Sequence, residues 1–506
     1  MIDLTVAQIA AIVGGELADI SAEAAAGLHV TGTVEFDSRK VTSGGLFLAL
    51  PGARADGHDH AASAVAAGAV AVLAARPVGV PAIVVAPDAK PAESGAGVLE
   101  HDTDGSGAAV LAALARLAAA VAQELVAGGL TIVGITGSAG KTSTKDLLAA
   151  VLAPLGEVVA PPGSFNNELG HPWTVLRATA RTDYLILELS ARHIGNIAAL
   201  AAIAPPAIGV VLNVGTAHLG EFGSREAIAK TKSELPQTVP RSGVVVLNAD
   251  DPAVAAMAEV TAARVVRISR QNHTDVWAGP VTLDELARPQ FALHAADDVV
   301  DVMLAVHGDH QVSNALCAAA VALECGATLQ QVAVALADAG PVSGHRMRVS
   351  TRSDGVTVID DAYNANPDSM RAGLQALAWI SAGGGAARRR SWAVLGEMAE
   401  LGEDAISEHD RIGRLAVRLD VSRLIVVGIG RSMSAMHHGA VMEGARGSEG
   451  ERVAAIVADA DAALTLLRAE LRPGDVVLVK ASNAAGLGAL ADSLITDRAD
   501  GQGDPR

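Results

Sequence analysis

The segment Thr131 to Thr144, TIVGITGSAGKTST, combines residue types and spacings that suit phosphate binding. Its β-branched apolar start predicts a buried strand, and the run DLLAAVLAPL that follows predicts a helix. A glycine-rich turn between them lets backbone N–H groups converge on phosphate oxygens, and the helix N-terminus adds partial positive charge. The alternative is an ordinary strand-to-helix turn that contains glycine. Because a lysine and a hydroxyl follow the last glycine, we predict a phosphate-binding loop at Thr136, Gly137, Ser138, Ala139, Gly140, Lys141 and Thr142.

Polar side chains follow other predicted strands in the same part of the chain. Glu188 ends the apolar run Tyr184 to Leu189, and His218 and Asn248 come after later runs of the same kind. In an open parallel sheet the carboxyl ends of the strands meet at one edge, where ligands bind. An unpaired carboxylate behind four apolar residues is costly to bury, so Glu188 is predicted to be a magnesium ligand instead of a surface carboxylate. His218 alone fits a structural loop histidine equally well.

Alternating strands and helices along the chain predict an α/β protein of about three domains. We place a small N-terminal α/β domain at 1–105, a central domain with a mostly parallel sheet and the phosphate loop at 106–340, and a C-terminal α/β domain at 341–506. The apolar stretch Ala108 to Val126 contains Arg116 and Glu124. It therefore predicts an amphipathic helix and not a membrane span.

Composition narrows the classes of function. The 506 residues are 50% hydrophobic, so several cores can be buried, and the net charge of -18 argues against general nucleic-acid or membrane-surface binding. Cys317 and Cys325 are predicted to be packed, reduced thiols. The first residues, MIDLTVAQIA, lack the basic segment of a signal peptide, so we expect a cytoplasmic protein that is not embedded in a membrane.

Over nearly its whole length the chain resembles the Mur ligases of peptidoglycan synthesis. The resemblance is carried, in order, by DSRKVTSGGLFLALPGARADGHD, GITGSAGKTSTKD, SFNNELGHPWTVL, LELSARHIGNI, NVGTAHLGEFGS, AIAKTKSEL, LNADDP, DDAYNANPDSM and LGEMAELG. The asparagine pair followed by ELG and the YNANP loop are most similar to the branch that adds D-alanyl-D-alanine to UDP-N-acetylmuramoyl-tripeptide.

This resemblance implies an ATP- and Mg²⁺-dependent ligase that acts on small molecules and is a monomer. The N-terminal domain would hold the UDP-sugar, and the central domain ATP and magnesium. A Rossmann-like C-terminal domain would close over both and bind the dipeptide. The peptide carboxylate would attack the γ-phosphate of ATP, and the amine of D-alanyl-D-alanine would then displace phosphate from the acyl phosphate.

The resemblance also implies roles for individual residues. Catalysis would involve Lys141, Glu188, His218 and Lys232. Lys232 would be carbamoylated, with Lys230 as the second choice for that role, although the default for any such lysine pair is a solvated helix face. The magnesium ligands would be Thr142, Glu188, His218 and Lys232. Besides the loop at 136–142, ATP would contact Asn248, Arg346, Asp361, Asn364 and Asn366. The uridine-nucleotide pocket would include Asp37, Ser38 and Arg39 with the strand of Phe47. The muramoyl peptide would face Asn166, Asn167, Arg192 and His193.

Two positions depart from the family pattern. Arg192 stands where the pattern ELGANH has asparagine, and the segment KASN at 480–483 replaces the more usual KGSR. Other classes of protein fit less well. A folylpoly-γ-glutamate synthetase, a related ligase, would lack the separate domain ahead of the phosphate loop. A GTPase would need N-K-x-D for guanine, where this chain has NADD at 248–251. A scaffold that had lost catalysis would not need Lys141 and Glu188 intact.

Overall fold

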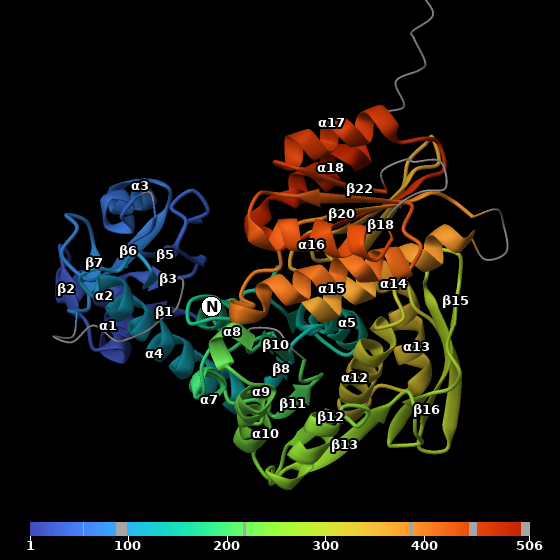
Figure 1. The fold of residues 1–506 in the computed structure, drawn as a ribbon. Helices are drawn as coiled ribbons and strands as arrows, with labels where there is room; N and C mark the ends of the chain where they lie inside the picture. Colours follow the sequence, from blue (N-terminus) through green and yellow to red (C-terminus); the bar gives the residue numbers. More distant parts are fainter. Residues whose placement is uncertain (54, 88–98, 216–218, 384–387, 445–452, 497–506) are drawn as a thin grey trace, which may run out of the picture.

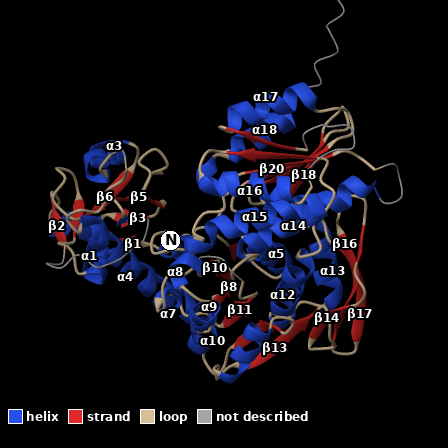
Figure 2. Cartoon of the chain, in the orientation of Figure 1, coloured by secondary structure: helices blue, strands red, loops and turns tan. Residues whose placement is uncertain are grey.

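A computed structural model shows an α/β protein whose larger sheets have five, ten and six strands. The structure describes residues 1–53, 55–87, 99–215, 219–383, 388–444 and 453–496. In Figure 1 the N-terminal unit (blue) lies to one side, while the central unit (green to yellow) and the C-terminal unit (orange to red) lie against each other. Helices flank the strands in each unit (Figure 2). The predicted fold class is confirmed.

The N-terminal unit is built on the five-stranded sheet. Its elements are β1 (Leu4–Thr5), α1 (Val6–Val13), β2 (Glu16–Ala18), α2 (Ala22–Gly27), β3 (His29–Val30), β4 (Val34–Glu35), β5 (Gly45–Leu48), η1 (Gly57–His60), α3 (Ala61–Ala66), β6 (Ala69–Ala74) and β7 (Ala82–Val84). The strand order is β2-β7-β6-β5-β4, and all neighbours pair in parallel except β2 with β7. Strands β1 and β3 form a separate antiparallel pair.

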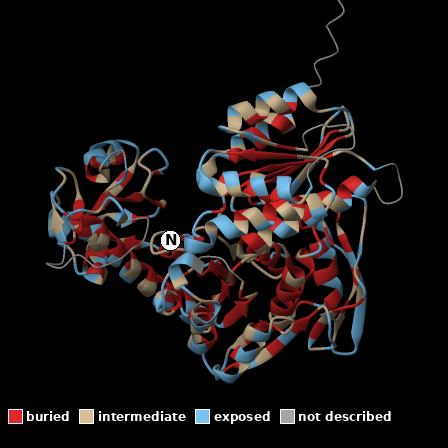
Figure 3. Ribbon diagram, viewed as in Figure 1, coloured by how far each residue is buried: buried red, intermediate tan, exposed pale blue. Residues whose placement is uncertain are grey.

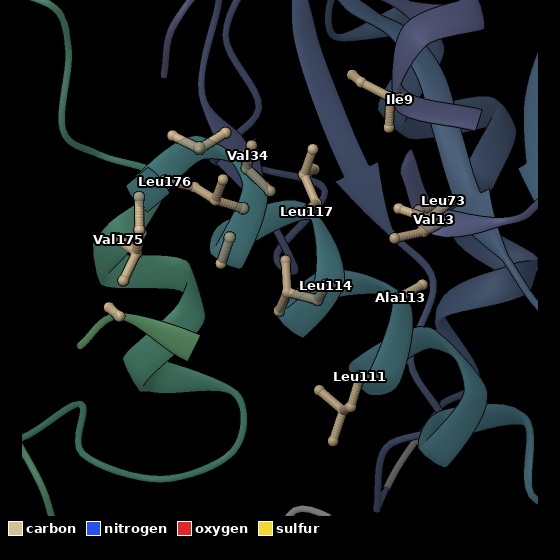
Figure 4. Packing of buried hydrophobic residues seen from close by; sticks show 14 of the residues in the cluster. Ile9, Val13, Val34, Leu73, Leu111, Ala113, Leu114, Leu117, Val175 and Leu176 are labelled. Atoms are coloured by element: carbon tan, nitrogen blue, oxygen red, sulfur yellow. The ribbon is translucent and has the colours of Figure 1, made fainter. Parts of the chain in front are cut away.

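A long helix, α4 (Ser106–Ala127), joins the N-terminal and central units. By length and composition it could cross a membrane, but half of its most apolar window is buried inside the protein. Figure 4 shows Leu114 and Leu117 of this helix close to Val175 and Leu176 of the central unit. The same buried cluster includes residues of α1 and β5, so α4 contributes to one core shared by the two units.

The central unit is built on the ten-stranded sheet. Its strands are β8 (Thr131–Thr136), β9 (Val158–Val159), β10 (Tyr184–Glu188), β11 (Ile208–Val211), β12 (Val244–Asn248), β13 (Arg264–Ser269), β14 (Val276–Ala278), β15 (Thr282–Leu283), β16 (Pro289–Ala295) and β17 (Asp298–Met303). Its helices are α5 (Lys141–Leu152), α6 (Gly170–Val175), α7 (Asn196–Ile203), α8 (Leu219–Phe222), α9 (Arg225–Lys232), α10 (Glu234–Thr238), α11 (Pro252–Ala255), η3 (Ala256–Glu259), α12 (Gln311–Glu324) and α13 (Leu329–Asp338).

Strands β8 to β14 of the central sheet pair in parallel, and β15 to β17 add an antiparallel edge. Alternate side chains of the parallel strands face opposite helical layers. Val210 and Val246 pack in a cluster with α5, α12 and α13, whereas Val211, Val245 and Leu247 pack in one with α9 and α11. With both faces covered, the functional groups of this unit lie at the ends of its strands.

The C-terminal unit is built on the six-stranded sheet, ordered β18-β19-β23-β20-β21-β22. Its elements are β18 (Arg348–Thr351), β19 (Thr357–Asp361), α14 (Pro367–Ala382), β20 (Ser391–Leu395), η5 (Gly402–Asp404), α15 (Ala405–Arg418), β21 (Arg423–Val427), α16 (Arg431–Met442), β22 (Ala454–Val457), α17 (Ala460–Glu470), β23 (Val476–Lys480), η6 (Asn483–Ala485) and α18 (Leu487–Thr496). Every pairing except that of β18 with β19 is parallel. Helices α14 to α16 cover one face of the sheet, and α17 and α18 cover the other.

Most strand residues of all three sheets are buried (Figure 3), and so is His171 of α6. Burial lowers its pKa to about 4, so the folded protein keeps a neutral imidazole where the unfolded chain becomes protonated. The unfolded state therefore binds more protons than the native state as pH falls from about 6.5 to 4, and stability is lost through that window.

We expect the free energy of unfolding to fall by about 2 kcal/mol more between pH 7.5 and 5 in the wild type than in His171→Met, which cannot titrate. Urea denaturation at both pH values measures the difference. The exposed His60 offers a matched control, because His60→Gln should keep the wild-type pH dependence. An equal loss in wild type and His171→Met would contradict the assignment.

Candidate active site

A cleft of about 1430 Å³ lies between the central and C-terminal units. The carboxyl ends of the central strands align beneath it, since Glu188 pairs with Ile135 and Val211 with Thr136. The predicted residues that line the cleft are Ser138, Ala139, Gly140, Lys141, Thr142, Asn166, Asn167, Arg192, His193, Asn248, Arg346, Asp361, Asn364 and Asn366. Thr136, Gly137, Glu188 and Lys232 are buried. The structure thus brings together most of the predicted site residues.

The phosphate loop has the predicted strand, turn and helix. Gly140 adopts a φ of 88°, a left-handed conformation that glycine tolerates, and α5 begins at the next residue. The Lys141 ammonium donates a hydrogen bond to the Gly137 carbonyl at 2.7 Å, so the side chain folds back over the turn. A positive charge, a helix N-terminus and the Thr142 hydroxyl therefore meet at one point, as phosphate binding requires.

Asn213, two residues after the end of β11, bonds to this loop from the side. Its Oδ1 accepts a hydrogen bond from Ala139 N at 2.9 Å, and its Nδ2 donates to Ala139 O at 3.1 Å. Its carbonyl also accepts from Ser138 N at 3.2 Å. Sequence analysis did not assign Asn213 to the site, although its place at a strand end was a usable signal. The Asn213 side-chain amide therefore holds the backbone of the turn in place.

The Glu188 carboxylate is fully buried under the cleft. Its Oε2 accepts hydrogen bonds from Thr142 Oγ1 at 3.4 Å, Ser164 Oγ at 3.3 Å and Asn166 Nδ2 at 3.3 Å. Its Oε1 has no hydrogen-bond partner within the described parts of the chain. A buried carboxylate oxygen without a partner is costly, and a hard cation held jointly with the Thr142 hydroxyl would satisfy it.

Two lysines lie near this part of the site: Lys141, which is partly exposed, and Lys232, which is buried. Burial lowers the pKa of Lys141, opposed by the negative charge of Glu188 and assisted by Arg346. Burial also lowers the pKa of Lys232 well below its usual value, and the Lys141 charge adds to the shift. Lys230, two residues earlier on α9, is exposed. Of the two lysines weighed from the sequence, Lys232 is therefore the one beside the loop. His218, predicted to act here, lies outside the described residues.

The C-terminal unit contributes Arg346 to the opposite wall of the cleft. Its guanidinium donates to Thr142 Oγ1 at 3.4 Å and stacks on Tyr363, with 4.2 Å to the ring centroid. The buried Lys480, at the end of β23, forms an ion pair with Asp361 and donates to Asn364 O at 3.0 Å. Lys480 was noted in the sequence only as part of a departure from the family pattern, and in the structure it holds the predicted ATP loop in place.

Asn248 and Asn366 also have local partners. Asn248 Nδ2 donates to Leu212 O at 3.0 Å, which ties the ends of β11 and β12 together. Asn366 caps α14 through Ser369 N, in a capping box. Asn314 of α12 was not predicted, yet it lines the cleft so close to Gly140 that a Cβ there would lie 2.6 Å from its Oδ1.

The residues predicted to face the peptide substrate lie in the central unit. Asn166 contacts Glu188, whereas Asn167 Oδ1 accepts from Gly170 N at 2.9 Å. Arg192 forms ion pairs with Glu400 of the C-terminal unit at 3.0 Å and with Glu221 at 3.8 Å. His193 is exposed at the rim.

The predicted uridine residues lie in the N-terminal unit and do not line the cleft. Arg39 pairs with Asp37 through two hydrogen bonds of 2.9 Å, and this lowers the pKa of Asp37 to about 2. Ser38 is partly exposed beside them. Phe47 is 1% exposed and packs in a core cluster with Val72, and the place of its strand at the uridine pocket stays a prediction.

Comparison with protein families gives matches along most of the chain. Residues 31–120 match a model described as the Mur ligase family, catalytic domain. Residues 135–322 match the Mur ligase middle domain, and residues 345–483 match the Mur ligase, glutamate ligase domain.

Individual proteins extend this likeness. The chain is 80% identical over 504 residues to the UDP-N-acetylmuramoyl-tripeptide--D-alanyl-D-alanine ligase of Mycobacterium tuberculosis H37Rv, covering 98% of each chain. Its identity to the Escherichia coli K12 protein of that name is 34% over 434 residues, covering 85% of this chain and 86% of that one. Among solved structures, MurF from Acinetobacter baumannii superposes with a TM-score of 0.79 at 28% identity, covering 98% and 99% of the two chains. The Thermotoga maritima MurF ligase in complex with ADP gives 0.73 at 26% identity, covering 92% and 97%.

Proposed function

The chain belongs to the Mur ligase family, and we propose that it is the ATP-dependent ligase that joins D-alanyl-D-alanine to UDP-N-acetylmuramoyl-tripeptide. The products are the UDP-muramoyl-pentapeptide precursor of peptidoglycan, ADP and phosphate. The observation that carries the proposal is the 80% identity, over 98% of both chains, to the M. tuberculosis ligase named for that reaction. We further propose that the enzyme acts in the cytoplasm as a 51.0 kDa monomer.

Charges from both walls of the cleft support phosphoryl transfer. Lys141 of the central unit bonds to Gly137 of the loop and Arg346 of the C-terminal unit bonds to Thr142, so a triphosphate lying on the loop would meet two positive charges. They would offset the charge on the transferring phosphoryl group when the peptide carboxylate attacks it. The amine of D-alanyl-D-alanine then attacks the acyl phosphate, and phosphate leaves. A cleft enclosed by two units limits hydrolysis of that intermediate by water.

A magnesium ion fits the oxygen donors beneath the loop. The Glu188 Oε1 atom, buried and without a partner among the described residues, and the Thr142 hydroxyl would hold it. When bound, the ion would neutralise phosphate charge. The resemblance implies His218 as a further ligand.

Lys232 is proposed to carry a carbamate. A buried ammonium beside Lys141 is unfavourable, and burial with the Lys141 charge lowers the pKa of Lys232, which favours the neutral amine that adds CO₂. The resulting anion would face the metal instead of adding a second positive charge. We expect protein incubated with ¹³C-bicarbonate to show a carbamate carbon signal by NMR that Lys232→Met lacks and Lys230→Met retains. A signal that persists in Lys232→Met would contradict this assignment.

The experiment that tests the function is phosphate release from ATP by the purified protein with Mg²⁺, UDP-muramoyl-tripeptide and D-alanyl-D-alanine. Release should require both acceptor substrates and yield the pentapeptide by mass spectrometry. Release driven by a folate and glutamate would move the protein to the folylpoly-γ-glutamate synthetases, and release with a single amino acid would move it to a sister Mur ligase. No release with any pair would overturn the proposal. Sedimentation as a single 51.0 kDa species would agree with a monomer.

A further inference from the structure

The connection between the central and C-terminal units, residues 339–347, is bonded on its central side to the helix that begins at the phosphate loop. Ser343 N and Ser343 Oγ each donate to the Asp146 carboxylate at 3.1 Å. Lys145 Nζ donates to Ser343 Oγ at 3.1 Å and to Pro161 O at 2.8 Å, and lies 2.7 Å from Asp146 Oδ1. The Lys145 side chain is 2% exposed and that of Asp146 is 11% exposed. These contacts form a closed, buried network around one serine.

The same connection is bonded on its other side to the C-terminal sheet. His345 Nδ1 lies 2.8 Å from Asp360 Oδ2, and Met347 N donates to Asp361 Oδ1 at 3.1 Å. His345 and Met347 have positive φ values of 55° and 50°, which non-glycine residues seldom adopt. Backbone held in that conformation needs surrounding contacts to keep it there. Arg346 lies between these two residues and points back to the central unit.

We propose that Lys145, Asp146 and Ser343 position Arg346 for the phosphoryl-transfer step, an inference that rests on the proposed function. Helix α5 carries Lys141 and Thr142 in its first turn and the anchor one turn later. The distance from the anchor to the phosphates is therefore fixed by the helix. Ser343 bonds the middle of the connection to that helix, and this fixes how far Arg346, three residues later, can reach toward Thr142.

The choice of residues supports a positioning role. A buried lysine and aspartate are seldom the most stabilising way to fill a space, because desolvation offsets much of their attraction. Their hydrogen bonds are directional, however, and three donors on one ammonium fix a backbone segment in a way that apolar packing does not. The neighbouring Val342 is 80% exposed, so the anchor contacts the connection at Ser343 and not along its whole length.

The test is a double-mutant cycle of Ser343→Ala and Arg346→Ala in the full-length enzyme. We expect Arg346→Ala to lower kcat about 100-fold and Ser343→Ala about tenfold, with the KM for the UDP-linked substrate changed less than about twofold. If Ser343 acts through Arg346, the double variant should be no slower than Arg346→Ala alone. A further tenfold loss in the double variant, or a wild-type kcat in Ser343→Ala, would overturn the inference.

Two more variants separate positioning from stability. Val342→Ala changes an exposed residue next to the anchor and should retain wild-type kinetics. Asp146→Asn, which keeps the size of the side chain, should repeat the non-additivity with Arg346→Ala. If these substitutions acted by a general loss of folding, each would lower the measured rate by the same factor in the wild type and in Arg346→Ala. Such equal losses would count against a positioning role.

Nucleotide affinity provides a readout that needs no acceptor substrate. Ser343→Ala and Arg346→Ala should each reduce the preference for a fluorescent ATP over the matching ADP, with no further reduction in the double variant. If the wild type ligated no acceptor, the proposed function would fail. The nucleotide preference would still show whether Ser343 positions Arg346. An unchanged preference in Ser343→Ala would overturn it.

Discussion

Replacing Lys141 by alanine is expected to abolish ligation while leaving the binding of the UDP-linked substrate largely intact. The ammonium lies over the turn of the phosphate loop, 2.7 Å from the Gly137 carbonyl, and Glu188 is the negative charge that favours its protonated form. Losing a fixed positive charge that stabilises the transferring phosphoryl group should lower kcat by about 10²–10³-fold. The fold should survive, because Lys141 is partly exposed and its desolvation is a cost that alanine does not carry.

Kinetics, calorimetry and denaturation together measure this result. Turnover should be lost in Lys141→Ala, while titration with UDP-muramoyl-tripeptide should give a dissociation constant within about threefold of wild type. Lys230→Ala is the matched control, since Lys230 is an exposed lysine on α9. Turnover at the wild-type rate in Lys141→Ala would contradict the assignment of this loop as the site that binds the ATP phosphates. Loss of UDP-substrate binding as well would mean that the substitution acts beyond the phosphate site.

The parts of the site that lie together in the sequence were the most predictable. The strand, the glycine turn, Lys141 and Thr142 are contiguous, so their local pattern predicted both structure and chemistry. Glu188 was predicted because a carboxylate that ends an apolar run is costly to bury unless it has a partner such as a metal ion. Arg346 reaches Thr142 from the other unit, and no local pattern determines such a contact. Its place was expected from the family resemblance and not from spacing.

Tertiary contacts account for what sequence analysis missed. Asn213 could be seen to follow a strand, but its two hydrogen bonds to Ala139 depend on the parallel register of β11 with β8. Phe47 lies in the run LFLAL, which does not alternate between apolar and polar residues. Such a run cannot show which face of a strand is open, and the whole of β5 proved to be buried. Lys480 likewise gains its role only when β23 pairs with β19.

Replacing Glu188 by glutamine is expected to uncouple nucleotide binding from metal binding. The side chain is fully buried, Oε2 is held by hydrogen bonds, and Oε1 lacks a partner in the described structure. Glutamine keeps the size of the group and one acceptor oxygen but removes the negative charge that a divalent cation needs. Thr142 and Asn166 would retain an acceptor, so the phosphate loop should keep its shape and ATP should still bind.

The metal site should weaken sharply in this variant. Binding of Mn²⁺ in the presence of a non-hydrolysable ATP analogue, followed by its electron paramagnetic resonance, should weaken at least about tenfold, and kcat should fall about 10²–10³-fold. Glu226→Gln is the matched control, because Glu226 is an exposed carboxylate in the first turn of α9. Mn²⁺ affinity equal to wild type in Glu188→Gln would show that the metal is held elsewhere. The unpaired oxygen beneath the loop would then need another partner, and the nearby ammonium of Lys141, whose pKa burial lowers against the opposing charge of Glu188, would be the first candidate.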